Sequence, residues 1–139
     1  MTSVNPYLNF AGNTEEAFNF YKSVFGGEFF MVQRYSNTPD ADKLPPGLKD
    51  KIMHISLPIG NNILMASDAC EELGFTVKQG NNFYICVNPD SKEEADKWFN
   101  ALAEGGKVNM PIQDMFWGAY WGDLTDKFGI QWMINYDKR

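Results

Sequence analysis

Few side chains in this 139-residue chain are suited to acid–base or covalent chemistry. His54 is the only histidine, and because imidazole titrates near neutral pH it is the natural general acid or base. Cys86 is a candidate nucleophile, although no basic residue flanks it to stabilise a thiolate. Asp68, Glu71 and Glu72 could pair with a cation or a metal. Each also has a structural reading: a histidine that stabilises its strand, a packed cysteine and a solvated acidic face.

The segments that would position these residues follow a motif that occurs twice, about 78 residues apart. In residues 13–17 and 91–95, Asn13 or Ser91 stands three positions before a glutamate, as in a capping box at a helix start. Apolar residues at i, i+3, i+4 and i+7 follow in both copies, and a Gly-Gly pair ends each stripe. A unit of this length that occurs only twice predicts two related modules in one domain, with a ligand cleft between them.

Each copy of the motif is preceded by one strand-like segment and followed by three. The expected strands are residues 7–10, 28–35, 51–58 and 63–68 around a helix that starts at Asn13, and then 82–88, 107–112, 118–125 and 130–136 around a helix over 91–104. These elements predict an α+β fold of two tandem β-α-β-β-β modules. We expect a single domain over 1–139, with module one at about 1–70, a connection at about 69–81 and module two at about 82–139.

Alternation along the strands separates two faces, because successive strand residues point to opposite sides of a sheet. One face is apolar and is expected to meet the helices. It carries Leu8, Phe10, Met53, Ile55, Leu57, Phe83, Ile85, Val87, Ile130, Trp132 and Ile134. The other face carries amides, hydroxyls, rings and thioethers but little charge, which is typical of a partly enclosed pocket.

The polar face supplies most of the predicted ligand-binding residues. These are Tyr7, Asn9, Ser56, Met65, Ser67, Tyr84, Cys86, Gln131, Met133 and Asn135, with His54 on the same face. Trp117 and Trp121 are added because the glycines of segment 116–122 leave their ring faces uncovered. Two alternatives stay open: the polar face packs against another subunit, or the tryptophans pack beneath the last strand.

Composition narrows the partners. The formal net charge is −6 and the lysines and arginines are scattered, which argues against nucleic-acid binding. No apolar run approaches the ~18 residues of a membrane span, and the first residues lack the pattern of a signal peptide, so we expect a cytoplasmic protein without a membrane partner. Cys70 and Cys86 form no CxxC pattern, which predicts reduced thiols.

Three segments carry a family resemblance: Pro6-Tyr7-Leu8, the run Phe20-Tyr21-Lys22-Ser23-Val24-Phe25-Gly26-Gly27, and Leu124-Thr125-Asp126-Lys127-Phe128-Gly129. Together with the duplicated module they resemble the vicinal oxygen chelate superfamily, most of all its PhnB-like group. This superfamily contains glyoxalase I, extradiol dioxygenases, fosfomycin-resistance enzymes and bleomycin-resistance proteins. One departure is Lys127, where the group usually has proline. The resemblance implies a curved, barrel-like mixed sheet with the helices on its outer face and a ligand in the concavity.

Metal-using members of the superfamily take His, Gln or Glu ligands from the first and last strands of both modules. The matching positions here are Asn5, Met65, Asn82 and Met133. Zn, Ni, Mn and Fe(II) prefer imidazole, carboxylate or thiolate, so we expect no metal and no other cofactor. PhnB-like proteins are sometimes labelled demethylubiquinone methyltransferases, but this chain has no Gly-rich strand-to-helix turn for a nucleotide cofactor.

The resemblance and the polar face together predict a homodimer that binds a small organic molecule without a metal. Bleomycin-resistance proteins, which the chain resembles in fold, in acidity and in lacking metal ligands, bind a drug without altering it. The alternative is a lyase, isomerase or dioxygenase that uses His54 or a metal held by an unexpected set of carboxylates. A third possibility is a scaffold whose polar face is covered by a partner. Whether the chain is an enzyme, and which ligand it takes, stays open.

Overall fold

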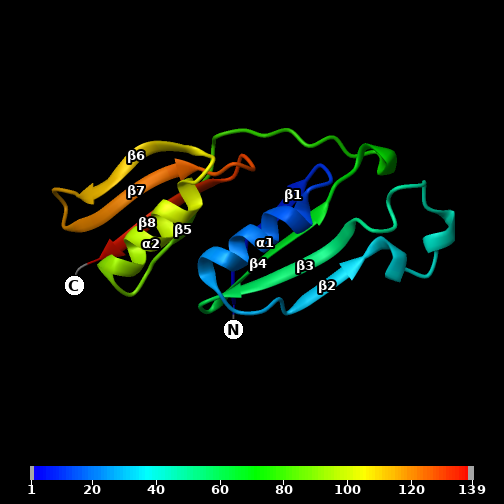
Figure 1. The fold of residues 1–139 in the computed structure, drawn as a ribbon, viewed down its shortest axis with the longest axis horizontal. Coiled ribbons are helices and arrows are strands. Elements are labelled where there is room, and N and C mark those ends of the chain that lie inside the picture. Colours follow the sequence, from blue (N-terminus) through cyan, green and yellow to red (C-terminus); the bar gives the residue numbers. More distant parts are fainter. Residues whose placement is uncertain (1, 138–139) are drawn as a thin grey trace. The chain divides into compact units, whose positions relative to one another are not determined.

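The computed structural model describes residues 2–137, and the chain folds as two compact units, Met1–Lys78 and Gln79–Arg139 (Figure 1). Unit one contains β1 (Tyr7–Phe10), α1 (Thr14–Phe25), β2 (Met31–Arg34), β3 (Ile52–Ile59) and β4 (Asn62–Asp68). Unit two contains β5 (Ile85–Val87), α2 (Lys92–Ala103), β6 (Lys107–Asp114), β7 (Ala119–Thr125) and β8 (Gln131–Asp137). The predicted α+β class and the repeated β-α-β-β-β order are confirmed.

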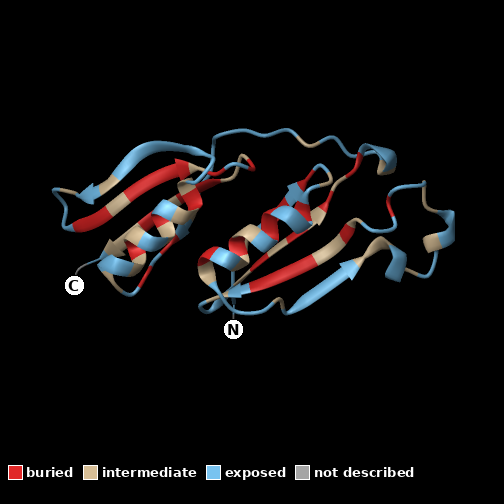
Figure 2. Ribbon diagram, viewed as in Figure 1, coloured by how far each residue is buried: buried red, intermediate tan, exposed pale blue. Residues whose placement is uncertain are grey.

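The strands form two four-stranded mixed sheets, ordered β1-β4-β3-β2 and β5-β8-β7-β6, which are not closed into a barrel. In each sheet the first strand of the unit runs parallel to its last strand, and the other neighbours are antiparallel. The edge strands β2 and β6 are largely exposed, whereas the inner strands hold most buried strand positions (Figure 2). No helix within residues 2–137 has the length and apolar character needed to cross a membrane.

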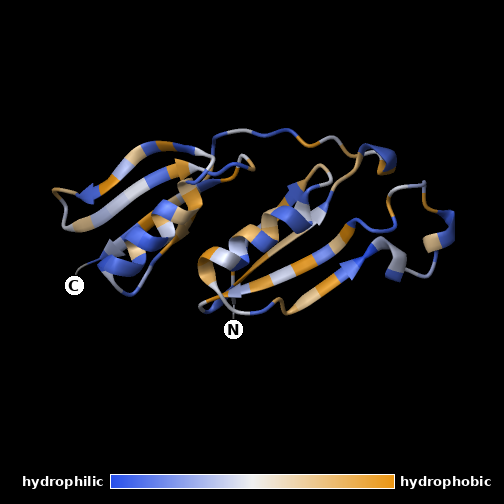
Figure 3. Ribbon diagram, in the orientation of Figure 1, coloured by the Kyte–Doolittle hydropathy of each residue, from blue (hydrophilic) through white to orange (hydrophobic). Residues whose placement is uncertain are grey.

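One helix covers one face of each sheet. Helix α1 packs on β3 and β4, and α2 packs on β6, β7 and β8. Their stripes bury Ala17, Phe18, Tyr21 and Val24 in unit one, and Ala95, Phe99 and Leu102 in unit two. The buried strand residues that face these helices are Leu8, Phe10, Leu57, Leu64, Ala66, Val87, Leu124, Trp132 and Ile134. The hydropathy of successive residues alternates along β3 (Figure 3). Each large apolar side chain buried this way contributes roughly 1.5–3 kcal/mol.

A bulge in β3 corrects part of the predicted apolar face. Gln33 pairs with His54, but Arg34 pairs with Ile52, so Met53 is an extra residue in the strand. Ile52 and Ile55 are therefore both buried, and the prediction that Met53 faces the helix is wrong. Phe83 was also expected on this face, but it precedes β5 and is 56% exposed.

The start of α1 is stabilised by a distant residue and not by the predicted capping box. Asn13 makes no side-chain capping bond. Instead Asp68 at the end of β4 accepts hydrogen bonds from Thr14 N (3.0 Å) and Thr14 Oγ1 (2.7 Å), and from Ile52 N (2.8 Å). Asp68 is only 2% exposed, so neither expectation for it, a solvated face or a cation site, is correct. Its carboxylate joins β4, α1 and β3.

Helix α2 begins as the sequence predicts. Ser91 Oγ accepts a hydrogen bond from Glu94 N (3.1 Å), and Glu94 Oε1 accepts one from Asp90 N (3.0 Å). A serine in this position stabilises a helix by about 1 kcal/mol. The two helix starts, related by the sequence repeat, therefore use different capping groups.

We expect Asp68→Ala to lower the free energy of unfolding by about 3 kcal/mol, because buried main-chain donors at Thr14 and Ile52 lose a charged acceptor. Ser91→Ala is the matched control. It should lower the free energy of unfolding by about 1 kcal/mol, since it removes the side-chain hydrogen bond that Ser91 makes at the start of α2. Urea denaturation followed by circular dichroism measures both. A smaller loss for Asp68→Ala than for Ser91→Ala would contradict the role assigned to Asp68.

Candidate functional site

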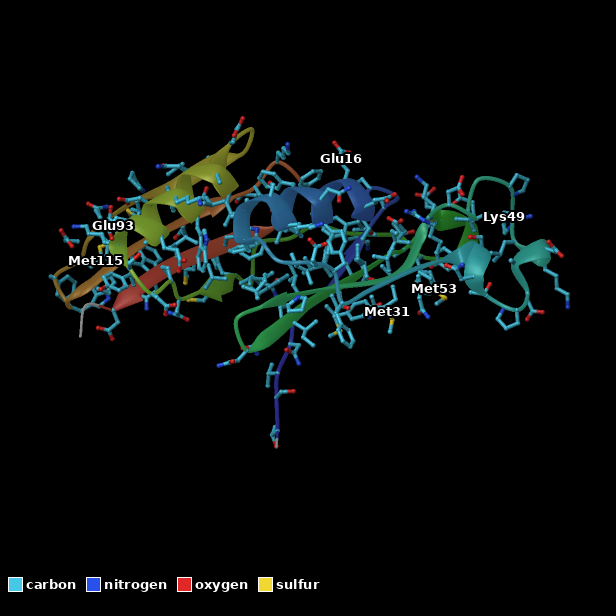
Figure 4. All side chains as sticks on the ribbon, turned by 60° about the horizontal axis from the view of Figure 1, so that its bottom comes forward. Glu16, Met31, Lys49, Met53, Glu93 and Met115 are labelled. Atoms are coloured by element: carbon cyan, nitrogen blue, oxygen red, sulfur yellow. The ribbon has the colours of Figure 1, made fainter. Side chains whose placement is uncertain are left out.

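The face of each sheet that its helix leaves uncovered is called here its open face. Strand register and alternation assign its members. The open face of unit one carries Tyr7, Asn9, Met31, Gln33, His54, Ser56, Met65 and Ser67. The open face of unit two carries Cys86, Lys107, Met110, Gln113, Trp121, Asp123, Thr125, Gln131, Met133 and Asn135. Figure 4 shows Met31 and Met53 on one side of the sheet and helix α1, which carries Glu16, on the other side. The predicted site residues thus fall into two groups, one in each unit.

A hydrogen-bonded chain of three side chains lies on the open face of unit one. Tyr7 Oη donates to Ser67 Oγ (3.1 Å), and His54 Nδ1 lies 3.3 Å from the same Tyr7 oxygen. The two rings are tilted, with centroids 5.7 Å apart. Because the hydroxyls of Tyr7 and Ser67 can each donate or accept, the contact with Nδ1 is compatible with either neutral tautomer of His54. In the tautomer that carries its proton on Nδ1, Nε2 is a proton acceptor.

Ser56 occupies the centre of the same face and lacks a hydrogen-bond partner. It is 3% exposed, and its Oγ is buried without a donor or acceptor within residues 2–137. In the register of the sheet it lies between Met31 on β2 and Met65 on β4. A buried hydroxyl with no partner costs about 1–3 kcal/mol.

Asp123 occupies the corresponding place in unit two. It is 8% exposed, and its Oδ1 is likewise buried without a partner among the described residues. In register it lies between Met133 on β8 and Met110 on β6. Burial raises the pKa of the Asp123 carboxyl, and a hydrogen bond with the Asn109 side chain acts in the opposite direction.

The two rows repeat the same arrangement. Across unit one the register reads Tyr7, Met65, Ser56, Met31, and across unit two it reads Cys86, Met133, Asp123, Met110. β3 and β7 are the third strands of their modules, so Ser56 and Asp123 are equivalent positions. Each module thus holds one buried polar atom without a partner between two thioether side chains. The methionine side chain is flexible and can adapt its shape to an irregular binding partner.

Aromatic side chains extend the open face of unit two. Trp121 points to the same side as Asp123, while Tyr120 points to α2 and donates to Asp96 Oδ1 (2.5 Å). This bond raises the pKa of Tyr120 to about 12. Trp117, 57% exposed in the turn before β7, meets Trp121 edge-on with ring centroids 6.4 Å apart. Both tryptophans therefore border the open face, whereas Tyr120 serves the helix.

The remaining predicted site residues differ in their exposure and hydrogen bonding. Gln131 is 8% exposed and its Nε2 donates to the Phe83 carbonyl (2.6 Å). Tyr84 is 37% exposed and precedes β5. The Cys86 residue is exposed, but partial burial of its thiol raises the pKa, which makes it a poorer nucleophile. Asn9 and Asn135 lie on the open faces, opposite Ser67 and Trp121.

The positions that match metal ligands do not fit a divalent metal. Asn5 Oδ1 already accepts a hydrogen bond from Ile63 N (2.9 Å). Met65 and Met133 offer thioethers, which are poor donors to the borderline divalent ions. Within residues 2–137, no group of three or more His, Cys, Asp or Glu side chains lies close enough to hold a metal ion. This donor set therefore offers no place for the metal of the superfamily.

Sequence reasoning missed Asp123, Met110 and Met31 as members of the open faces. The signal for Asp123 was present: Trp121, Asp123 and Thr125 alternate with residues that face α2, and Leu124 marks the buried parity. What the pattern does not contain is the missing partner of its carboxylate, because that depends on neighbouring strands.

The sequence of the chain matches a protein family and a sequence relative. The family described as 3-demethylubiquinone-9 3-methyltransferase matches residues 2–135. Protein YjdN of Escherichia coli (strain K12) is 33% identical over 144 aligned positions, which cover 98% of this chain and 96% of that protein.

Solved structures share the fold. Protein PA1353 from Pseudomonas aeruginosa is 41% identical, with a TM-score of 0.87 over 99% of this chain and 98% of that chain. A putative 3-demethylubiquinone-9 3-methyltransferase, PhnB protein, from Bacillus cereus is 26% identical, with a TM-score of 0.78 over 97% and 99%. A glyoxalase/bleomycin resistance protein/dioxygenase family enzyme from Burkholderia phytofirmans PsJN, at 20% identity and a TM-score of 0.62 over 96% and 98%, shares the fold alone.

We expect Asp123→Asn to stabilise the protein at pH 7 by about 1 kcal/mol, because it removes a buried charge whose Oδ1 has no partner. A raised folded-state pKa means that the folded form binds the proton more tightly, so stability falls as pH rises through that pKa. The gain from the substitution should therefore disappear as pH falls through the pKa and the wild-type carboxyl becomes neutral. Urea denaturation between pH 4 and pH 7 measures this.

Asp114→Asn is the control for this prediction, because Asp114 is an exposed carboxylate 3.6 Å from Lys92. Its removal should change stability by no more than about 0.5 kcal/mol. If Asp123→Asn destabilised the protein at pH 7, the Asp123 carboxylate would have to make a stabilising contact.

Proposed function

The chain belongs to the family described as 3-demethylubiquinone-9 3-methyltransferase, in the PhnB-like group of the vicinal oxygen chelate superfamily, and from this membership we propose that it binds a small organic molecule on the open faces of its sheets, without a metal. It does so as a homodimer in the cytoplasm. A guest is held by non-covalent contacts with rings, thioethers and neutral polar groups.

The observation that carries this proposal is the position of the two buried polar atoms without partners. Ser56 Oγ and Asp123 Oδ1 both lie on open faces, at equivalent places in the two modules. Buried polar groups in proteins are nearly always hydrogen-bonded, and exceptions call for an explanation. A molecule bound at each open face that supplies the hydrogen-bond partner there is such an explanation, because an unpaired buried polar atom costs about 1–3 kcal/mol.

The chemistry around these atoms favours binding over covalent reaction. The Cys86 thiol has a raised pKa, and the positions that match metal ligands are amides and thioethers. The family description names a methyltransferase. Our proposal does not adopt that activity, because the sequence contains no G-x-G-x-x-G and no other Gly-rich strand-to-helix turn of the kind that holds a nucleotide cofactor.

We expect the neutral dye Nile red to bind saturably, with enhanced emission, because the rings and thioethers of the open faces exclude water from an apolar guest. Trp121→Ala should weaken binding by about 5-fold or more, which corresponds to roughly 1 kcal/mol of lost ring contact. The matched control is Trp98→Ala, which removes a tryptophan from α2. Fluorescence titration measures the affinities, and sedimentation equilibrium on the same samples measures the proposed dimer.

Two results would count against the proposed site. Nile red that fails to saturate on the folded protein would remove the binding function. Equal losses in Trp121→Ala and Trp98→Ala would place the dye somewhere other than the open face of unit two.

A second candidate function, acid–base catalysis by His54, is favoured by one specific contact. The chain from Ser67 through Tyr7 orients the imidazole, and a neutral ring that carries its proton on Nδ1 would present Nε2 as a base. This is the arrangement that a lyase or isomerase of the superfamily would need to take a proton from a substrate. The contact between Tyr7 and His54 would also be made if it only stabilised the sheet. A test of catalysis therefore measures both the tautomer of His54 and the turnover of a substrate.

Because His54 is the only histidine, its two ring nitrogens can be assigned without ambiguity by long-range ¹H–¹⁵N spectroscopy. We expect the neutral ring to carry its proton on Nδ1, and Tyr7→Phe to shift the population toward Nε2–H because the acceptor is gone. The control is Asn9→Ala, which changes a residue on the same strand and the same face as Tyr7, and it should leave the tautomer unchanged. A wild-type ring protonated on Nε2 would remove the proposed base.

A further inference from the structure

We infer that the ligand of unit two is an organic cation with at least one N–H donor, a protonated amine on an apolar or aromatic body, and that Asp123 is its counter-ion. This inference rests on the proposed function and assigns a chemical class to the molecule bound at one of its two faces. Three aspartate carboxylates are buried within residues 2–137: Asp68, Asp123 and Asp126.

The other two buried carboxylates have full sets of hydrogen-bond donors. Asp68 accepts from two donors of Thr14 and from Ile52 N. Asp126 accepts from the main-chain N–H groups of Phe128 (2.8 Å) and Ile130 (3.1 Å) and from Trp132 Nε1 (2.8 Å). These two acids stabilise the fold. Their bonding is what a buried carboxylate normally needs.

Asp123 differs because its Oδ1 is as deeply buried but has no donor within residues 2–137. No ion pair joins Asp123 to a described cation. Lys107, the cation in the neighbouring row of the same face, is exposed and lies opposite Thr125. A carboxylate left in this state is costly, and the cost falls when a positively charged donor arrives. The vacant acceptor therefore selects for a cation that carries a hydrogen.

The surroundings of Asp123 match the rest of such a ligand. Trp121 lies two residues along the same strand on the same face, and Trp117 packs against it. An indole ring attracts a nearby cation through its negative face and also contacts an apolar body. Met110 and Met133 flank the carboxylate in register.

The methionines also provide a route to the buried oxygen. Met110 is 41% exposed on the edge strand β6, and its Sδ accepts only a weak hydrogen bond from Gln113 Nε2 (3.5 Å). Its unbranched side chain has three rotatable bonds, so it can move aside without moving the backbone. Displacement of this side chain would let an N–H group of the ligand approach Oδ1.

The experiment uses four small probes that share a phenyl ring: phenethylamine, its neutral analogue 2-phenylethanol, its quaternary analogue phenethyltrimethylammonium and the anion 3-phenylpropanoate. Isothermal titration calorimetry at pH 7 measures each with the wild-type protein and with Asp123→Asn and Asp114→Asn. We expect phenethylamine to bind at least 10-fold more tightly than 2-phenylethanol, and more tightly than the quaternary cation, which has no N–H donor. The anion should bind weakest.

The variants separate Asp123 from general acidity. Asp123→Asn should weaken phenethylamine binding at least 10-fold and should change the affinity for 2-phenylethanol much less. Asp114→Asn removes the same charge elsewhere and should leave both unchanged. The inference is overturned if phenethylamine binds no better than 2-phenylethanol, if Asp123→Asn leaves it unaffected, or if the quaternary cation binds equally well.

The outcomes also distinguish this inference from the proposed function. Binding of 2-phenylethanol or Nile red without a preference for the amine overturns the cation and leaves the binding function standing. Failure of every probe, Nile red included, removes both.

Discussion

Each four-stranded sheet has one helix to cover it, and a sheet has two faces. The apolar stripes of α1 and α2 account for one face of each sheet, because that is where Ala17, Phe18, Ala95 and Phe99 are buried. The opposite face receives no helix and is not simply solvated, since Ser56 and Asp123 are buried there. This asymmetry separates the residues that hold the fold together from those that are available to a guest.

Buried polar groups follow the same division. On the helix side they are fully bonded: the Asp68 carboxylate joins three elements, and Tyr120 donates to Asp96. On the open faces the bonding is incomplete at Ser56 and Asp123. Proteins tolerate such costs where function requires them, and remove them elsewhere. The position of the unsatisfied atoms is therefore more informative about function than the identity of any one residue.

The duplicated module permits the two open faces to diverge while their geometry is kept. Equivalent strand positions hold Ser56 in one unit and Asp123 in the other, each between two methionines. The frame is conserved within the molecule, whereas the central group changes from a neutral hydroxyl to a carboxylate. Under the function proposed above, the first would suit a neutral polar ligand and the second a cation, so the two related modules would each recognise a different ligand chemistry.

The sequence by itself determined the two modules, the two helices and the separation of an apolar from a polar face, because capping residues, helical stripes and strand alternation are local patterns. It also placed Tyr7, Ser67 and His54 on one face, and the structure then joined them by hydrogen bonds. It misplaced Met53, since a bulge depends on pairing with β2. Only the tertiary structure decided that Asp68 caps a helix 54 positions away and that Asp123 Oδ1 has no partner among the described residues. Burial and hydrogen bonding are set by side chains from other strands, which no local pattern specifies.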